Sequence, residues 1–191
     1  MKLPHASAAL PRHDATWQDG WWSQATAIPS PNCGPRPAGM AIDLVVIHSI
    51  SLPPGEFGTP FVVDLFTNRL DWDAHPYFQT IRGAEVSAHF FIQRDGSLIQ
   101  FVSADQRAWH AGASSWQGRS NCNDYTIGIE LEGLEGGRFE QPQYDCLQSL
   151  LGALRLAYPT LTDMVGHEDV APGRKFDPGV GFDWAFFVDK N

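Results

Sequence analysis

The sequence has few cysteines, and they are not arranged as a metal site or a disulfide framework. Its 191 residues contain three, Cys33, Cys122 and Cys146, with no C-x-x-C pair. A secreted domain would more often carry an even, paired set. We therefore expect a reduced compartment, in which each cysteine is a small buried apolar side chain.

Long apolar runs and excess positive charge are also missing. The strongest apolar run, residues 44–50, already contains His48 and Ser49, and Pro4 and Pro11 interrupt the N-terminal segment. Neither a membrane span nor a signal peptide is predicted, so the expected location is the cytoplasm. Thirteen Lys and Arg against 22 Asp and Glu give a net charge of -9. This charge argues against nucleic acid and anionic membranes as partners.

The remaining composition is that of a globular protein, with 43% apolar and 18% charged residues. Residues 1–16 are expected to form a loose tail, and 17–191 a single domain. Buried or half-buried strands are predicted at 43–51, 87–93, 97–102 and 125–133, and helices at 61–70, 142–158 and 183–190. Residues 71–86 are expected to be irregular, and the region after 166 to be a loop. The predicted fold class is α/β, a central mostly antiparallel or mixed sheet flanked by helices.

The predicted strand at 125–133 has an unusual acidic face. Its apolar side chains alternate with Gly128, Glu130 and Glu132, a period of two that places the two groups on opposite faces. An ionised carboxylate is costly to bury without a partner, so Glu130 requires a polar or metal-lined cavity if this strand is central. The alternative is a solvated sheet face, which antiparallel sheets often have. The pattern alone leaves both interpretations open.

The histidines follow no compact metal motif, because H-E-x-x-H is absent. Seven are present: His5, His13, His48, His75, His89, His110 and His167. A lone imidazole such as His48, at the end of an apolar strand, is more often a hydrogen-bonded core residue than a ligand. His75 and His89 are expected to be structural for the same reason.

A cation and a carboxylate follow His167 in the late loop. Lys175 and Asp177 are two residues apart, so in an extended segment they project to the same side. They are either a surface ion pair, worth under about 1 kcal/mol, or a ligand and a partner for an oxyanion.

Five blocks of this sequence together resemble a known enzyme family. They are IHSISLPPGEFG, DAHPYF, VSAHFFIQRDG, RAWHAGASSWQGRSNCNDYTIGIELEG and GHEDVAPGRKFDPG. In order and with compatible spacing, they resemble the N-acetylmuramoyl-L-alanine amidase family, which also includes phage lysozyme-type amidases and peptidoglycan recognition proteins. Within it, they are most similar to the cytoplasmic 1,6-anhydro-N-acetylmuramoyl-L-alanine amidases of peptidoglycan recycling. The resemblance runs from about Trp17 to Val188.

The resemblance implies a catalytic zinc site and assigns a role to each of its residues. His48, His167 and Asp177 would bind Zn2+, leaving the fourth tetrahedral position to water. Glu130 would accept the proton of that water and return it to the leaving amine. Lys175 would face the oxyanion of the tetrahedral intermediate.

Substrate contacts are implied as well, with two departures from the family. Trp109 and His110 would form a wall for sugar or peptide, with Arg119 nearby. Arginines are more usual in the family where this chain has Glu85 and Asn121. Such arginines would pair with carboxylates of the stem peptide, so we expect weaker binding of the peptide end.

Three other functions compete with a recycling amidase. A non-catalytic peptidoglycan-binding module of the same fold would lack a zinc ligand. An amidase acting on intact cell wall would need export and often a wall-binding domain, and a generic zinc peptidase would carry H-E-x-x-H. We therefore expect a monomeric zinc amidase whose partner is a small muropeptide, with no nucleic-acid or membrane partner.

Overall fold

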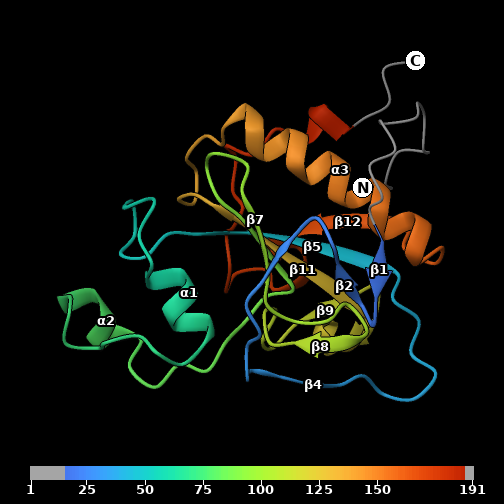
Figure 1. Cartoon of the computed structure of the whole chain (residues 1–191), viewed down its shortest axis with the longest axis horizontal. Coiled ribbons are helices and arrows are strands. Elements are labelled where there is room, and N and C mark those ends of the chain that lie inside the picture. Colours follow the sequence, from blue (N-terminus) through green and yellow to red (C-terminus); the bar gives the residue numbers. More distant parts are fainter. Residues whose placement is uncertain (1–15, 188–191) are drawn as a thin grey trace.

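The computed structural model describes residues 16–187 and has a six-stranded mixed sheet at its centre (Figure 1). In spatial order its strands are β12 (Asp163–Gly166), β5 (Leu44–Ile50), β11 (Thr126–Glu132), β6 (Phe90–Ile92), β7 (Leu98–Gln100) and β3 (Thr26–Ala27). Two-stranded ribbons join β1 (Trp17–Gln18) to β2 (Trp21–Trp22), β4 (Cys33–Pro35) to β8 (Gln106–Ala108), and β9 (Ser115–Trp116) to β10 (Arg119–Ser120). The helices are α1 (Phe61–Phe66), α2 (Pro76–Thr80), α3 (Gln141–Ala157) and α4 (His167–Val170), with 3-10 turns at Cys122–Asp124 and Trp184–Phe187.

The centre of the sheet is parallel because β5 and β11 are buried on both faces. β5 carries the apolar run LVVI, and all seven residues of β11 are buried. Such strands need cover on both sides, which is typical of parallel sheets. Of the five strand pairings, β6 with β7 is antiparallel and the other four are parallel.

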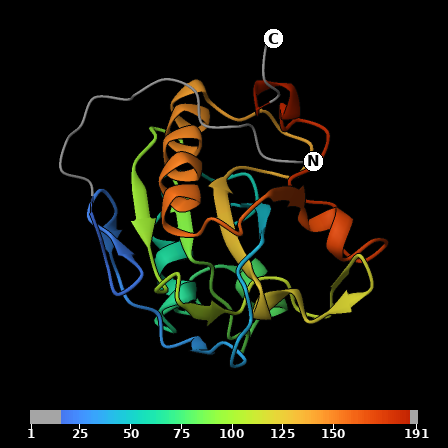
Figure 2. The same cartoon turned by 90° about the vertical axis from the view of Figure 1, so that its right-hand side faces the viewer.

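Helix α3 covers one face of the sheet (Figure 2). It begins after Glu140, whose backbone N–H donates to the side chain of Gln143 at 3.0 Å. Its leucines recur every three or four residues and pack on the apolar side chains of β5 and β11. The buried leucines of α3 are Leu147, Leu150, Leu151 and Leu154.

The opposite face of the sheet is covered near β6 and β7 by α1 and α2. Phe91 and Ile99 from these strands pack with Phe66 and Phe78 of the two helices in a second apolar cluster. Figure 1 shows α1 and α2 side by side, away from α3. Over β5 and β11 this face carries a third apolar cluster around Leu44 and Val46 and, toward the carboxyl ends of the strands, the polar side chains of His48 and Glu130.

Most of the predicted elements are confirmed. The strands predicted at 43–51, 87–93, 97–102 and 125–133 and the helices predicted at 61–70 and 142–158 are all present, several of them shorter than predicted, and the sheet is mixed. Two short helices were missed: α2 lies within the segment predicted to be irregular, and α4 begins where a loop was predicted. Both have fewer than six residues, so their apolar residues cannot establish a helical period.

Both ends of the chain lie partly outside the described residues. Of the helix predicted at 183–190, the described part is the 3-10 turn Trp184–Phe187, with the Asp183 carboxylate accepting from Ala185 N at 3.0 Å, and 188–191 lie outside the described residues. The expected tail, residues 1–16, lies outside them too, apart from residue 16. Over residues 16–187, no helix has both the length and the apolar character needed to cross a bilayer.

The packing of α3 gives the first prediction. Leu147 is fully buried, so Leu147→Ala should lower the free energy of unfolding by about 2–5 kcal/mol through lost burial and the cavity left behind. Leu156 on the same helix is 80% exposed, and Leu156→Ala should change it by less than about 0.5 kcal/mol. Urea denaturation of both variants checks this. Equal losses would contradict the assigned burial face of α3.

Candidate functional site

The carboxyl ends of three parallel strands bring the candidate residues together. β11 pairs with β5 so that Glu130 lies directly beside His48, on the same face of the sheet. β12 pairs with β5 so that Gly166 lies beside Ile47. His167 follows Gly166 as the first residue of α4, at the same edge as His48. Ligand sites of open α/β sheets lie at this edge.

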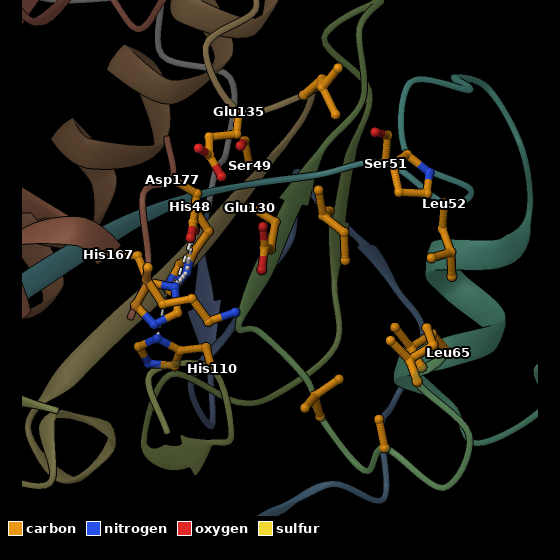
Figure 3. Close-up of a pocket in the computed structure, with 18 of the residues that line it drawn as sticks. His48, Ser49, Ser51, Leu52, Leu65, His110, Glu130, Glu135, His167 and Asp177 are labelled. Carbon is orange, nitrogen blue, oxygen red and sulfur yellow. Dashed lines mark hydrogen bonds and ion pairs between the residues drawn. The ribbon is translucent and has the colours of Figure 1, made fainter. Parts of the chain in front are cut away.

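A returning loop adds the third member of the cluster. The carbonyl of Asp177 accepts a hydrogen bond from Glu168 N at 3.0 Å, which fixes the loop beside His167. Asp177 Oδ2 then lies 3.2 Å from His48 Nδ1 and 3.1 Å from His167 Nδ1, and the two nitrogens are 2.9 Å apart. Figure 3 shows the three side chains converging.

The geometry and chemistry of this cluster fit a metal ion. Ligand atoms bonded at about 2.0–2.1 Å to one tetrahedral ion lie roughly 3.3 Å from each other. The three atoms here are separated by 2.9–3.2 Å, close to one triangular face of such a tetrahedron. Two imidazole nitrogens and a carboxylate oxygen so close together present lone pairs to one point, which a cation stabilises. His48, His167 and Asp177 could therefore hold a metal.

The surroundings of His48 and Asp177 keep these two side chains in the charge state that a metal requires. Burial lowers the pKa of His48 to about 4, and repulsion from His167 adds to this effect, so His48 is neutral near pH 7. Burial raises the pKa of Asp177, but hydrogen bonds with His167 and His48 outweigh it and hold that pKa well below its usual range. A neutral imidazole and an ionised carboxylate are the forms that bind metals.

Glu130 faces the same cluster and has an unusual environment. Its side chain is 8% exposed, and its Oε2 atom has no hydrogen-bond partner among the described residues. Burial raises the pKa of Glu130 well above its usual range, and the charge of Asp177 raises it further, while Lys175 opposes both. A buried carboxylate without a partner is costly unless it serves a chemical role.

Glu130 and Glu132 share a face of β11 but have different surroundings. Glu132 accepts from the backbone N–H of Gly58 at 2.5 Å through Oε1 and from that of Arg94 at 3.1 Å through Oε2. Both of its oxygens are therefore engaged in holding neighbouring loops. Only Glu130 of the two has a free oxygen in the site.

The cluster lies at the bottom of a pocket of about 550 Å³. Its other walls come from the loop after β5, from α1 and α2, and from the segments around Trp109 and Lys175. Seven of the residues that the sequence singled out line it: His48, Trp109, His110, Glu130, His167, Lys175 and Asp177.

Arg119 lies apart from this group. Its guanidinium makes two hydrogen bonds to the carboxylate of Asp43, at 2.8 and 3.0 Å, and covers the ring of Tyr125. It does not contribute to the wall of the pocket, and its substrate contact stays a prediction. Neither Glu85 nor Asn121 contributes to that wall either, although Ala84 and Val86, the neighbours of Glu85, do.

Several lining residues were not found from the sequence. Tyr77 comes from α2, and Arg174 and Phe176 flank Lys175. The position of Arg174 and Phe176 beside two candidate residues was a signal that could have identified them. No sequence signal pointed to Tyr77, because its helix α2 was not predicted.

Fold and site together are those of a hydrolase whose His-His-Asp group could hold a metal, and comparisons with known proteins give its family. The profile of the N-acetylmuramoyl-L-alanine amidase family matches residues 38–180. The chain therefore belongs to this family and is an N-acetylmuramoyl-L-alanine amidase.

One curated relative and one solved structure are similar to this chain over most of its length. The chain is 50% identical over 170 residues to the 1,6-anhydro-N-acetylmuramyl-L-alanine amidase AmpD of Citrobacter freundii, covering 88% of this chain and 91% of that one. A crystal structure of a selenomethionine derivative of AmpD matches with a TM-score of 0.88 at 49% identity, over 90% of this chain and 97% of that one.

A third match contains a substrate. The amidase AmiD of E. coli in complex with anhydro-N-acetylmuramic acid-L-Ala-D-gamma-Glu-L-Lys has a TM-score of 0.55 at 27% identity, over 78% of this chain and 58% of that one. Its fold is therefore shared with this chain.

The cluster predicts one divalent metal ion per chain. Asp177→Ala should abolish stoichiometric metal, because it removes the only anionic ligand of the three. Asp145, an exposed carboxylate on α3, supplies the control, and Asp145→Ala should retain the ion. Elemental analysis of dialysed proteins measures both. Full metal content in Asp177→Ala would contradict the assignment.

Proposed function

We propose that this chain is a zinc-dependent amidase that cleaves the bond between 1,6-anhydro-N-acetylmuramic acid and L-alanine in peptidoglycan turnover fragments. The observation that carries the proposal is the free carboxylate oxygen of Glu130, buried beside a His-His-Asp cluster within one pocket. The names of the AmpD relatives and the substrate in the AmiD complex support the choice of substrate.

His48, His167 and Asp177 would hold the zinc. Two imidazoles and one carboxylate are a ligand set of catalytic zinc sites, and with three protein ligands one position stays open. When bound there, zinc polarises the amide carbonyl and lowers the pKa of water to around 7. No cysteine takes part in this cluster, which is consistent with a catalytic rather than a structural ion.

Glu130 is the general base and then the general acid. Its Oε2 has no partner to displace, so it can accept the proton of the attacking water. The same buried group then gives that proton to the nitrogen of L-alanine as the amide bond breaks. The raised pKa of Glu130, caused first by burial, makes its protonated form accessible for this second transfer.

Lys175 stabilises the negative charge that develops on the carbonyl oxygen. It lines the same pocket as Glu130 and His48, which places a cation in the wall that the substrate would contact. A fixed cation at a developing oxyanion lowers the barrier because the charge exists only in the transition state. Trp109 and His110 would contact the substrate from the wall of the pocket, with Arg119 farther out.

The enzyme would work as a monomer on small muropeptides in the cytoplasm. The three cysteines are all free, as a reducing compartment allows. The pocket is formed within one chain and has the size of a small-molecule site. The net charge of -9 disfavours nucleic acid and anionic membranes as partners.

A pair of variants on one strand tests the role of Glu130. Glu130→Gln should retain zinc and lose roughly 10²–10⁴-fold in kcat, because the amide cannot take up a proton. Glu132→Gln, two residues along the same face, should lose less than about tenfold, because Glu132 holds loops rather than protons. Steady-state kinetics with measured zinc content separates the two. Near-normal turnover in Glu130→Gln would place the base elsewhere.

The substrate is tested by comparing two forms of peptidoglycan. Purified protein should release peptide from soluble anhydromuropeptides at a far higher rate than from intact sacculi, as measured by chromatography of the products. A chelator should stop the reaction, and zinc should restore it. Efficient cleavage of sacculi with no hydrolysis of anhydromuropeptides would favour the rival function, an amidase of the intact wall.

A further inference from the structure

We propose that the dipeptide His110–Ala111 is the positioning element of the metal site, fixing both histidine ligands from behind. The inference rests on the proposed function, in which His48 and His167 bind zinc. It concerns His110, Ala111 and the side chains of Asn123 and Thr126 that hold them, and it gives His110 a positioning role in addition to any contact with substrate.

In both ligands, the ring nitrogen that faces away from the cluster, Nε2, contacts this dipeptide. His48 Nε2 lies 2.9 Å from His110 Nδ1, and His167 Nε2 lies 3.3 Å from the carbonyl oxygen of Ala111. Two ligands from different elements, His48 on β5 and His167 on α4, thus meet two consecutive residues of one segment. Figure 3 shows the ring of His110 lying below His48 and His167.

These contacts fix which ring nitrogen of each histidine carries its proton. A histidine that binds metal through Nδ1 must carry its proton on Nε2. His48 Nε2–H then donates to His110 Nδ1, and His167 Nε2–H donates to the carbonyl of Ala111. With Nδ1 accepting, His110 carries its own proton on Nε2, which lies 3.1 Å from Thr126 Oγ1 and donates to it. With a metal bound, every proton would point away from the cluster, and both Nδ1 lone pairs would be available to the ion.

The dipeptide is itself held in place by neighbouring side chains. Asn123 Oδ1 accepts from the backbone N–H of His110 at 3.1 Å and from that of Ala111 at 2.8 Å. The guanidinium of Arg174 donates to the carbonyl of Ala111 at 2.7 Å. Asn123 Oδ1 therefore fixes the backbone of both residues. The side chain of His110 and the carbonyl of Ala111 are in turn the groups that orient the ligands.

Strand β11 leaves space for the ring of His110. A Cβ atom at Gly128 would lie 2.4 Å from that ring, so only glycine allows the imidazole to lie against the strand at this point. Thr126, two residues earlier on the same face, supplies the acceptor for His110 Nε2. β11 thus places Glu130 beside His48, and its residues Thr126 and Gly128 hold the ring of His110.

Buried polar chains of this kind affect metal affinity because they orient the ligands before the ion binds. Removing the hydrogen-bond partner of a ligand histidine's other ring nitrogen typically lowers metal affinity by about 10–100-fold. We expect His110→Ala to weaken zinc binding by that amount, since His48 loses the acceptor that fixes its tautomer. His110→Asn should recover most of the affinity, because Asn Oδ1 can accept from His48 Nε2 close to where Nδ1 does.

Chelator competition on the folded proteins measures the zinc dissociation constant. His75 supplies the control, because it contacts Tyr77 N at the start of α2 and none of the ligands, and His75→Asn should bind zinc as the wild type does. Equal affinities in the wild type and His110→Ala would overturn the inference while leaving the proposed function intact. A wild type that binds no zinc would instead overturn the proposed function.

Ring-nitrogen NMR of the zinc-loaded wild type tests the same point without any variant. The 15N shifts of His110 should show a protonated Nε2 and an unprotonated Nδ1 that accepts a hydrogen bond. A merely structural role for His110 would not dictate this tautomer. Observation of a protonated Nδ1 on His110 would overturn the inference, because that nitrogen could not then accept from His48.

Discussion

The parallel pairing of β5 with β11 is the constraint on which the site depends, because it places Glu130 directly beside His48 on one face of the sheet. The side-chain period of two gives each strand an apolar face toward α3 and a second face with polar groups. A shift by one residue would send His48 and Glu130 into the core beneath α3. The contacts of Ile47, Ile129 and Leu131 with that helix therefore fix the register of the reacting groups.

The polar face is stabilised by hydrogen bonds between neighbouring groups. Two histidines and the half-buried guanidinium of Arg36 are packed behind the cluster, and the histidines contact His48, Thr126 and the backbone N–H of Gly128. Arg36 Nη2 donates to the carbonyls of Ala104 and Thr126, and the same nitrogen lies 3.0 Å from His89 Nε2. Burial lowers the pKa of Arg36 to about 10, which still leaves it charged near neutral pH. Among the buried polar atoms of the described residues, Glu130 Oε2 is the carboxylate oxygen without a partner, and it is therefore free for chemistry.

The sequence predicted the elements with strong periodic patterns and failed for the short ones. The alternation in 125–133 and the leucine spacing of α3 each depend on local residues, so they could be recognised without the fold. α2 and α4 are held by their neighbours: His75 Nδ1 accepts from Tyr77 N, and the Asp177 carbonyl accepts from Glu168 N. The family resemblance supplied the members of the cluster. No sequence signal could pair His48 with His110, which lies 62 positions away.

The central claim is that one metal ion is held by His48, His167 and Asp177 at the open end of this sheet. A crystal structure of the zinc-loaded protein, with anomalous diffraction recorded at the zinc edge, tests it most directly. The account predicts one anomalous peak within about 2.0–2.2 Å of His48 Nδ1, His167 Nδ1 and a carboxylate oxygen of Asp177. A peak bound to a cysteine, or to His48 through Nε2, would contradict it.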